Sequence, residues 1–582
     1  MSLHADAATS YTYQPLKTNE IRLALLEPSS HDDGPLRNLH WALTRARRRR
    51  QPDSAADVVV WADALCINQR DDVERGAQVA MMSRIYAKAR SVLVCMGPEL
   101  SFAGGSLVAS LLSEWEASAA TAGTDIDVED VQWRALGALT SAPWFGRVWV
   151  LQEVGLAQNP RVIYGGGPDD TVGVEEFSYR LLRRVIAWTR SRMPNFAVYM
   201  GIEGLMVHDS WLNWSQPEAQ ALELSAHCQF LDLLDQGALL KCHDPRDRIY
   251  AFLGHPFASA AGPIIPDYTK PKLQVFQETT ILLLHDSGIR TLASVEHDPQ
   301  TIKEEAPSWV VRWDVTPTFN NIWNPYSPMY NSGVGLGTGP AWELNRNSLQ
   351  IEGVVVDSVL AVFSIRVVPN RLQILFHSAG DDHWQPLTLF APALEQDTST
   401  PFAYSTIKAA ILAHTLCGQP WDGQYEDNNL LRRFAEYLSS NHESHDWKQE
   451  MGPFYWRAET LCQGRAFVIT KKGYYGLAPG ICRPGDVCAV VQGGSVPFLL
   501  RPELLNAGGG AGSAMPRRLV GEMYLHDFME GQAGSMVREG ALTKELITLW
   551  RCLLFVLVYH VVYIKQGQRS GPEEDSDTLS PT

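Results

Sequence analysis

The sequence predicts an α/β domain built on a parallel sheet, followed by a helical region and a mixed α+β region. Two apolar runs predict the first domain. Residues 58–61 and 91–97 are continuous apolar stretches rich in β-branched residues, a pattern typical of strands buried on both faces. Apolar residues between them recur at helical spacing, so this segment predicts a right-handed βαβ unit with parallel strands.

Changes in residue pattern along the chain predict the remaining organisation. Helical patterns dominate after about residue 171. After about residue 301, short alternating runs are split by Gly, Pro and Asn, which is typical of β-rich modules. The predicted parts are 11–170 (the α/β domain), 171–300 (mainly helical), 301–531 (mixed α+β with a β-rich module) and 532–582 (an apolar segment and a disordered acidic tail).

Local signals predict further elements of the first domain. Asp71 or Asp72 can cap a helix that runs to about residue 90. The helix at 36–50 ends in four arginines, which suit the negative end of a helix dipole; a nucleic-acid patch is the alternative. We also expect a short strand at 21–26, helices at 131–140 and 143–157, and a strand at 161–164.

Composition excludes several classes of protein. With 582 residues, 45% apolar and 20% charged, the chain has a globular core and room for three or four domains. Its formal charge of −16 repels phosphate backbones, so we expect no nucleic-acid partner. The nine cysteines form no C-x-x-C pair, and the first residues carry no secretory signal. These features predict a cytoplasmic protein without a metal site.

Residues 546–564 form an apolar stretch close to the length of a membrane span. Arg551 and His560 interrupt it. Because such residues are unfavourable inside a bilayer, the pattern favours a buried segment, and membrane contact through 546–564 is the alternative.

Polar residues gather directly after the first predicted strand, in the segment WADALCINQ at 61–69. Ligands of open α/β sheets bind beyond the carboxyl ends of the strands, where we expect Asp63, Asn68 and Gln69 to lie. The N-terminus of the following helix would favour an anion there. Alternatively, Asp63 and Asn68 bond to the loop backbone, as such residues often do.

A second cluster, PWFGRVWVLQEV at 143–154, sets two charged residues among apolar ones. On a continuous helix, Phe145, Trp149 and Glu153 share one face. A carboxylate set against aromatic rings could have a raised pKa and act as an acid or a base. Alternatively, Glu153 binds a backbone amide or Arg147 in a domain core, since unpaired buried charge is costly.

Both clusters resemble the fungal heterokaryon-incompatibility (HET) domain. The family pattern W-I-D-A-[IL]-C-I-N-Q matches WADALCINQ, and R-x-W-x-x-Q-E matches RVWVLQE. The motif core of these matches comprises Trp61, Cys66, Trp149 and Gln152. Further on, HDPRDRIYAFLG, IPDYTKP, PSWVVRWD and LVGEMYLHDFMEG resemble other segments of long HET proteins, so the resemblance covers about residues 11–531.

One block of the family pattern is absent. HET proteins usually carry A-L-S-Y-x-W-G between the first strand and the helix that here begins at Leu36, but only residues 26–35 occupy that interval. The HET domain is therefore predicted to be shortened, through either a gene-model error or a genuine loss. A parallel sheet without the missing strand would expose an unpaired edge.

The resemblance implies a role in allorecognition, in which HET-bearing proteins trigger programmed cell death when incompatible fungal cells fuse. It also implies a sheet like that of TIR and other flavodoxin-like domains, and some TIR domains cleave NAD with a glutamate. By that analogy Glu153 or Asp63 is the candidate catalytic carboxylate, and Asn68, Gln69 and Arg147 would orient the ligand.

Two functions from different classes follow. A signalling module would self-associate or bind a protein partner through its HET domain. A TIR-like hydrolase would be activated by association, with NAD as its substrate. The chain has no Gly-rich phosphate loop, so a Rossmann-type NAD-redox role has no support. No cofactor is assigned, and NAD enters only as the substrate of the second function. A degenerate, inactive copy is a further alternative, and no chemistry is assigned to residues 330–460.

Overall fold

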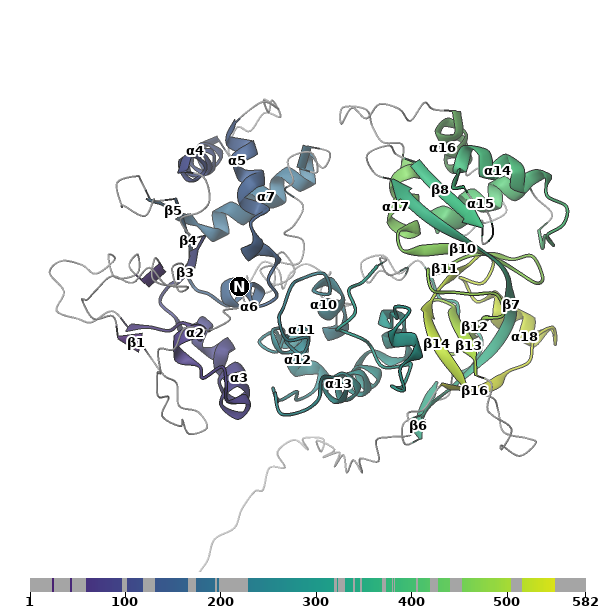
Figure 1. Ribbon diagram of the computed structural model, residues 1–582, viewed down its shortest axis with the longest axis horizontal. Helices are drawn as coiled ribbons and strands as arrows, with labels where there is room; N and C mark the ends of the chain where they lie inside the picture. Colours follow the sequence, from purple (N-terminus) through teal and green to yellow (C-terminus); the bar gives the residue numbers. More distant parts are fainter. Residues whose placement is uncertain are drawn as a thin grey trace, which may run out of the picture.

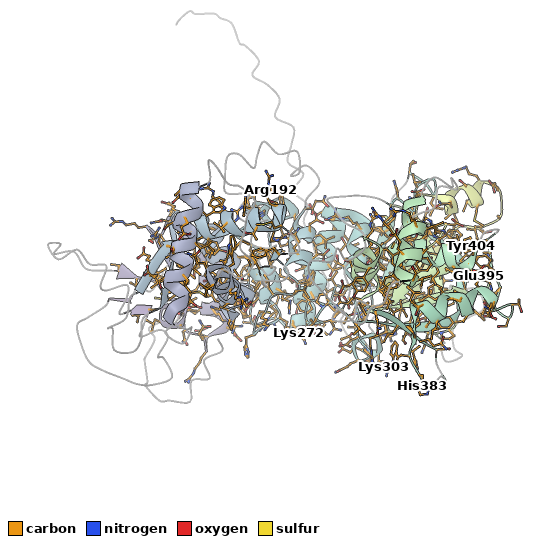
Figure 2. All side chains as sticks on the ribbon, turned by 90° about the horizontal axis from the view of Figure 1, so that it is seen from above. Arg192, Lys272, Lys303, His383, Glu395 and Tyr404 are labelled. Atoms are coloured by element: carbon orange, nitrogen blue, oxygen red, sulfur yellow. The ribbon has the colours of Figure 1, made fainter. Side chains whose placement is uncertain are left out.

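The computed structural model shows three parts that lie in a row, with a helical part between the two others (Figure 1). The view from above in Figure 2 has the same order. The structure describes residues 59–96, 102–118, 131–165, 174–193, 229–318, 341–345, 348–368, 373–378, 383–404, 407–418, 428–439, 453–503 and 516–549, with short pieces at 24–25, 42–43, 196–197, 202, 322, 330–338 and 380.

The N-terminal part combines a small sheet with helices. Strand β3 pairs in parallel with β4, and β4 pairs antiparallel with β5. Helices α4 and α7 pack on this sheet and enclose an apolar cluster with it. The elements of this part are β1 Ala24–Leu25, β2 Val59–Val60, α2 Asp63–Cys66, α3 Asp72–Lys88, β3 Val92–Cys95, α4 Phe102–Ser118, α5 Val131–Thr140, η1 Pro143–Gly146, α6 Val150–Gly155, β4 Pro160–Gly165, β5 Val174–Ser178 and α7 Tyr179–Arg192.

Helix α3 begins where its sequence predicts. The Asp71 carboxylate accepts hydrogen bonds from the backbone N–H groups of Val73 and Glu74, so Asp71 is the N-cap. Lys88 lies in the last turn, where a cation suits the helix dipole. The choice between Asp71 and Asp72 is thereby settled.

The first apolar run does not form the strand that was expected. Strand β2 pairs antiparallel with β1 and is not hydrogen-bonded to β3. Val59 is 55% exposed, so burial on both faces is wrong. The βαβ prediction is also wrong in its pairing, because the parallel partner of β3 is β4 from later in the chain. An apolar run indicates that a strand forms, but the neighbouring strand is chosen by tertiary packing.

The helix expected at 143–157 is broken into two. A 3-10 turn, η1, is followed by extended backbone at Arg147 and then by α6. Lys241 pairs with Arg147 in a parallel bridge, which needs this extended backbone. Phe145 and Trp149 consequently pack in different apolar clusters, so the expected place of Phe145 on one stripe with Trp149 and Glu153 is wrong. Trp149 and Glu153 remain one helical turn apart, because the Glu153 N–H donates to the Trp149 oxygen.

The middle part is helical and shares one apolar cluster with its neighbours. Val79 and Met82 of α3, with Val148 and Leu151, belong to the same cluster as buried residues of the middle helices. Helices α3 and α6 are therefore built into the middle part as well as the first. The elements here are α10 Phe230–Gln236, α11 Asp247–Tyr250, α12 Pro256–Ala261, α13 Lys272–Ser287, η4 Gly288–Ser294 and η5 Thr301–Lys303.

The C-terminal part is organised by one long strand, β7, which pairs with five others. Its elements are β6 Trp342–Asn345, β7 Ser348–Val368, β8 Gln373–Ser378, β9 Gln385–Pro386, α14 Leu387–Gln396, α15 Lys408–Cys417, α16 Asn428–Ser439, α17 Pro453–Cys462, β10 Arg465–Thr470, β11 Tyr475–Pro479, β12 Val487–Val491, β13 Phe498–Pro502, β14 Arg517–Glu522, β15 Tyr524–Leu525, α18 Gln532–Arg538 and β16 Glu545–Leu549.

Five of these strands close into a ring. Each strand in the order β12, β13, β14, β16 and β7 pairs with the next, and β7 pairs again with β12. A closed ring leaves no sheet edge exposed. The second half of β7 continues outside the ring, where it pairs with β8 and β10, and helices α14 to α17 lie beside this extension in Figure 1.

Three sequence expectations fall largely on residues outside the described ranges. These are the shortened interval 26–35, the helix at 36–50 apart from residues 42–43, and the apolar stretch 546–564 beyond Leu549. Within the described residues, no helix is long and apolar enough to cross a membrane.

Candidate functional site

The segment 61–69 forms a short helix and a loop that bond largely to themselves. The Asp63 carboxylate accepts from the backbone N–H of Ala64, and the Gln69 amide donates to the backbone oxygen of Asp63. The Asn68 side-chain oxygen accepts from the backbone N–H of Arg70. These bonds match the backbone-bonding alternative for Asp63 and Asn68 and shape the loop itself.

Glu74 ties this loop to helix α3. Its carboxylate is buried and accepts a hydrogen bond of 2.9 Å from the backbone N–H of Asn68. Cys66 is fully buried beneath the loop. Cys66 therefore has a core role, whereas Asp63 and Gln69 are exposed.

Trp61 packs against helix α3. Its ring lies edge-to-face against Tyr86, with 5.6 Å between the ring centroids. The indole nitrogen of Trp61 is enclosed and has no hydrogen-bond partner in the described part of the chain. This pair forms an aromatic wall, and its Tyr86 lies near Glu153 of α6 and Arg147.

Glu153 is the most perturbed acid at this wall. Burial raises the pKa of Glu153 to about 7, with Asp63 raising it further and Arg147 lowering it. Among the described residues, no hydrogen bond or ion pair reaches its carboxylate. Tyr86 faces the same charges, because burial, Glu153 and Asp63 raise the pKa of its hydroxyl while Arg147 lowers it. Asp63, Tyr86, Arg147 and Glu153 thus lie within electrostatic reach of one another.

Chemically, this group can exchange a proton near neutral pH. A carboxyl group with a pKa of about 7 is present in both forms at that pH, as a general acid or base needs to be. The structure brings Asp63, Arg147 and Glu153 together. It does not aim Asn68 and Gln69 at them, since both bond within their own loop.

Gln152 and Trp149 face the middle part. Gln152 is buried, and Gly254 lies so close that an added Cβ atom would sit 2.6 Å from its amide nitrogen. The Trp149 indole N–H donates to the carboxylate of Asp247 at 3.1 Å. These two residues of the motif core therefore contact the segment 247–254 of the middle part.

Asp247 and Tyr268 are site residues that the sequence reasoning missed. The Tyr268 hydroxyl donates to the Asp247 carboxylate at 2.6 Å. Burial raises the pKa of Asp247 to about 6, and the hydrogen bonds from Tyr268 and Trp149 oppose that shift. We call Trp149, Asp247 and Tyr268 the Asp247 clamp. A signal was present in HDPRDRIYAFLG, which sets four charged residues before an apolar run.

Asp244 forms a second link beside the clamp. Its carboxylate pairs with Arg75 of α3 at 2.9 Å and with Arg246 at 2.7 Å. The Arg75 guanidinium lies 3.5 Å above the centre of the Tyr268 ring, and Arg246 donates to the backbone oxygens of Tyr268 and Lys270. Although burial alone would raise it, the bonds and charge of the two arginines keep the pKa of Asp244 below its usual value.

A shallow cleft of ≈ 440 Å³ opens next to these residues, at the N-terminal ends of α3 and α13. Its four lysine and arginine side chains are already paired: Arg75 and Arg246 with Asp244, Lys270 with Glu278, and Lys272 with Asp314. Figure 2 shows Lys272 at the rim of the middle part. Within the described ranges, no cluster of His, Cys, Asp and Glu could hold a metal ion.

Two parts of the chain match known protein families. Residues 7–153 match the family model Heterokaryon incompatibility protein (HET), and residues 419–540 match that of the Het-6 beta-barrel domain. The resemblance to HET proteins inferred from the sequence is therefore confirmed for these two parts of the chain. The ring described above includes β7 and β16, which lie outside the second match.

One curated relative covers most of the chain. It is Heterokaryon incompatibility protein 6, OR allele, of Neurospora crassa, 21% identical over 602 residues that span 85% of this chain and 83% of the relative. No solved structure gives a match.

Proposed function

We propose that this heterokaryon-incompatibility protein triggers or modulates programmed cell death through self-association or partner binding of its HET domain in the fungal cytoplasm. The HET and Het-6 barrel matches and the relative from Neurospora crassa support the general role. The observation that supports the binding mechanism is that the polar side chains of segment 61–73 bond to their own backbone and so shape an exposed loop.

The surface that follows the loop suits a protein partner. Gln69, Arg70, Asp71 and Asp72 are exposed, and Val73 is 71% exposed among them. An apolar side chain rimmed by charges of both signs resembles the composition of small protein interfaces. We therefore place the binding surface at the N-terminal end of α3.

Expression of the full chain in a fungal strain that lacks it tests this proposal. We expect loss of viability, together with co-precipitation of a second tagged copy or of a partner protein. Val73→Lys should reduce both effects. Val131→Lys, at a position on α5 that is 56% exposed, is the matched control and should retain both. Equal behaviour of the two variants, or unimpaired growth with the wild-type chain, would contradict the proposal.

A second function has its own support, namely hydrolysis of NAD by a TIR-like site. The partly buried Glu153 carboxyl, with its pKa raised by burial to about 7, lies near Asp63, Tyr86 and Arg147. Glu153, or less directly Asp63, would act on the nicotinamide–ribose bond, and Arg147, Asn68 and Gln69 would orient the substrate. The parallel pairing of β3 with β4 is compatible with a TIR- or flavodoxin-like sheet.

Nicotinamide release from NAD distinguishes the two functions. If the site is hydrolytic, the purified full chain at high concentration releases nicotinamide, and Glu153→Gln abolishes release while circular dichroism shows an intact fold. Glu436→Gln, an exposed glutamate of α16, serves as the control. Absence of release at high protein concentration would rule out this second function and leave the signalling proposal standing.

A further inference from the structure

We infer that residues 241–268 form a strap that positions the candidate site, with Asp247 as the positioning residue. This strap lies beyond the HET match, which ends at residue 153. The geometry of the site would then depend on how the middle part of the chain packs against helices α3 and α6. The biological meaning of this inference rests on the proposed function, whereas its test below does not.

The first link runs from the strap to helix α6. Trp149 immediately precedes α6, and its backbone oxygen accepts from the N–H groups of Gln152 and Glu153. The same residue donates its indole N–H to Asp247. Asp247 therefore fixes the position of Trp149, which begins the first turn of α6. Glu153 lies one turn further along this helix.

A second link fixes the other charge of the site. Arg147 and Lys241 form a parallel bridge, in which Val148 donates to the Lys241 oxygen at 3.0 Å and Lys241 donates to the Gly146 oxygen at 2.6 Å. This bridge holds the extended backbone between η1 and α6. Because Arg147 stands at that bend, the start of the strap sets its direction.

The third link reaches helix α3, which carries Tyr86. Arg75 pairs with Asp244 and lies over the ring of Tyr268. One turn from the helix start, Gly76 approaches the backbone of Pro266 so closely that an added Cβ atom would lie 2.7 Å from its oxygen. The strap thus contacts both helices that contribute to the site.

These links give the strap control over the geometry of the site. Asp247 is buried, and its two carboxylate oxygens accept from Trp149, outside the strap, and from Tyr268, within it. Moving the strap away from Trp149 would therefore leave a buried polar group unpaired. Displacement of the strap would release α6 and change the separation of Arg147, Glu153 and Tyr86. A partner that binds the middle part can therefore act on the site through Asp247.

Ionisation of Glu153 reports this coupling without any assay of function. In the full chain labelled with ¹³C-glutamate, its carboxyl signal is assigned by its loss in Glu153→Gln and followed against pH. Trp149→Phe keeps an aromatic ring and removes the bond to Asp247. We expect the pKa of Glu153 to fall by about one unit as α6 loosens and water enters.

Control and second variants make the outcome decisive. Trp188→Phe, in α7 of the same part, should leave the Glu153 pKa unchanged. Tyr268→Phe removes only a hydroxyl and serves if Trp149→Phe does not fold; it should shift the pKa in the same direction. Asp247→Asn should add little to Trp149→Phe, because the Trp149 bond is already absent and the remaining amide oxygen can still accept from Tyr268. An unchanged pKa in Trp149→Phe and Tyr268→Phe, or an equal shift in Trp188→Phe, would overturn the inference.

Discussion

Two acidic side chains, the fully buried Glu522 of the C-terminal ring and the partly buried Glu153 of the N-terminal part, differ in how their charge is balanced. The Glu522 side chain is fully enclosed and accepts from Arg465 and from the backbone N–H of Ile322, both at 2.6 Å. Glu153 has no such bond in the described residues, and burial raises its pKa to about 7. The charge of Glu522 is balanced by Arg465 of strand β10, whereas the site keeps an acid that titrates near neutral pH.

The two regions also differ in which residues hold their elements in place. The ring closes through its own strands. Helices α3 and α6 instead depend on contacts with residues 241–268, far along the chain. Loss of the Arg465–Glu522 pair should therefore lower stability, whereas changes at the strap should act on the site.

Removing the partner of Glu522 should have the largest effect. Arg465→Met leaves a carboxylate buried without its cation, and we expect unfolding free energy to fall by about 3–5 kcal/mol. Arg432→Met breaks an exposed pair in α16 and should cost less than about 1 kcal/mol. Urea unfolding of both variants checks this difference, and similar losses would contradict the structural role of the buried pair.

Glu153→Gln should change stability in a pH-dependent way. A folded-state pKa raised from 4.5 to about 7 means that the native protein binds the proton more tightly, so this stabilisation is present below pH 4.5 and lost as pH rises through 7. The neutral variant escapes that loss. Relative to wild type it should gain up to about 3 kcal/mol between pH 5 and pH 8.

Urea unfolding at the two pH values measures that gain. Glu436→Gln, whose side chain is 58% exposed, should show no comparable change between them. The same pH response in both variants would mean that Glu153 is not held in an enclosed position.

The close approach between α3 and the strap reverses an ordinary helix preference. Alanine normally stabilises a helix relative to glycine by about 1 kcal/mol, but Gly76→Ala should destabilise by about 1–3 kcal/mol because its Cβ meets the Pro266 oxygen. Ala80→Gly, at an exposed position of the same helix, should also destabilise. Thermal unfolding of both variants measures these changes in stability. A stabilising Gly76→Ala would show that the strap does not lie in close contact with α3.

The N-cap of α3 should give the smallest effect. Asp71→Ala removes the acceptor for two backbone N–H groups and should cost about 1 kcal/mol. Asp72→Ala, at the next position, removes an exposed carboxylate 3.7 Å from Arg75 and should cost less than about 0.5 kcal/mol. Equal losses in a urea titration would contradict the cap assignment.

Local signals in the sequence predicted local structure. Helix α3 with its aspartate cap, helix α5 and strand β4 lie where capping and periodicity placed them, because these preferences depend on near neighbours. The domain limits at 170, 300 and 531 remain predictions.

Local sequence signals could not predict contacts between residues that are far apart in the chain. The partner of Trp149 is 98 positions away, and nothing in the local pattern of 143–157 indicates that Lys241 would break the helix at Arg147. The electrostatic grouping of Asp63, Arg147 and Glu153 was inferred from the family resemblance, whereas Tyr86 and Asp247 entered only through their contacts. The roles of all these residues remain proposals.

The ionisation of Glu153 in the wild-type full chain tests the assembled site most directly. A pH titration of its carboxyl ¹³C signal should give a pKa near 7, because burial beside Asp63 outweighs the charge of Arg147. A pKa near the ordinary value of 4.5 would show that the carboxylate is in water and that the two stretches of chain do not enclose it.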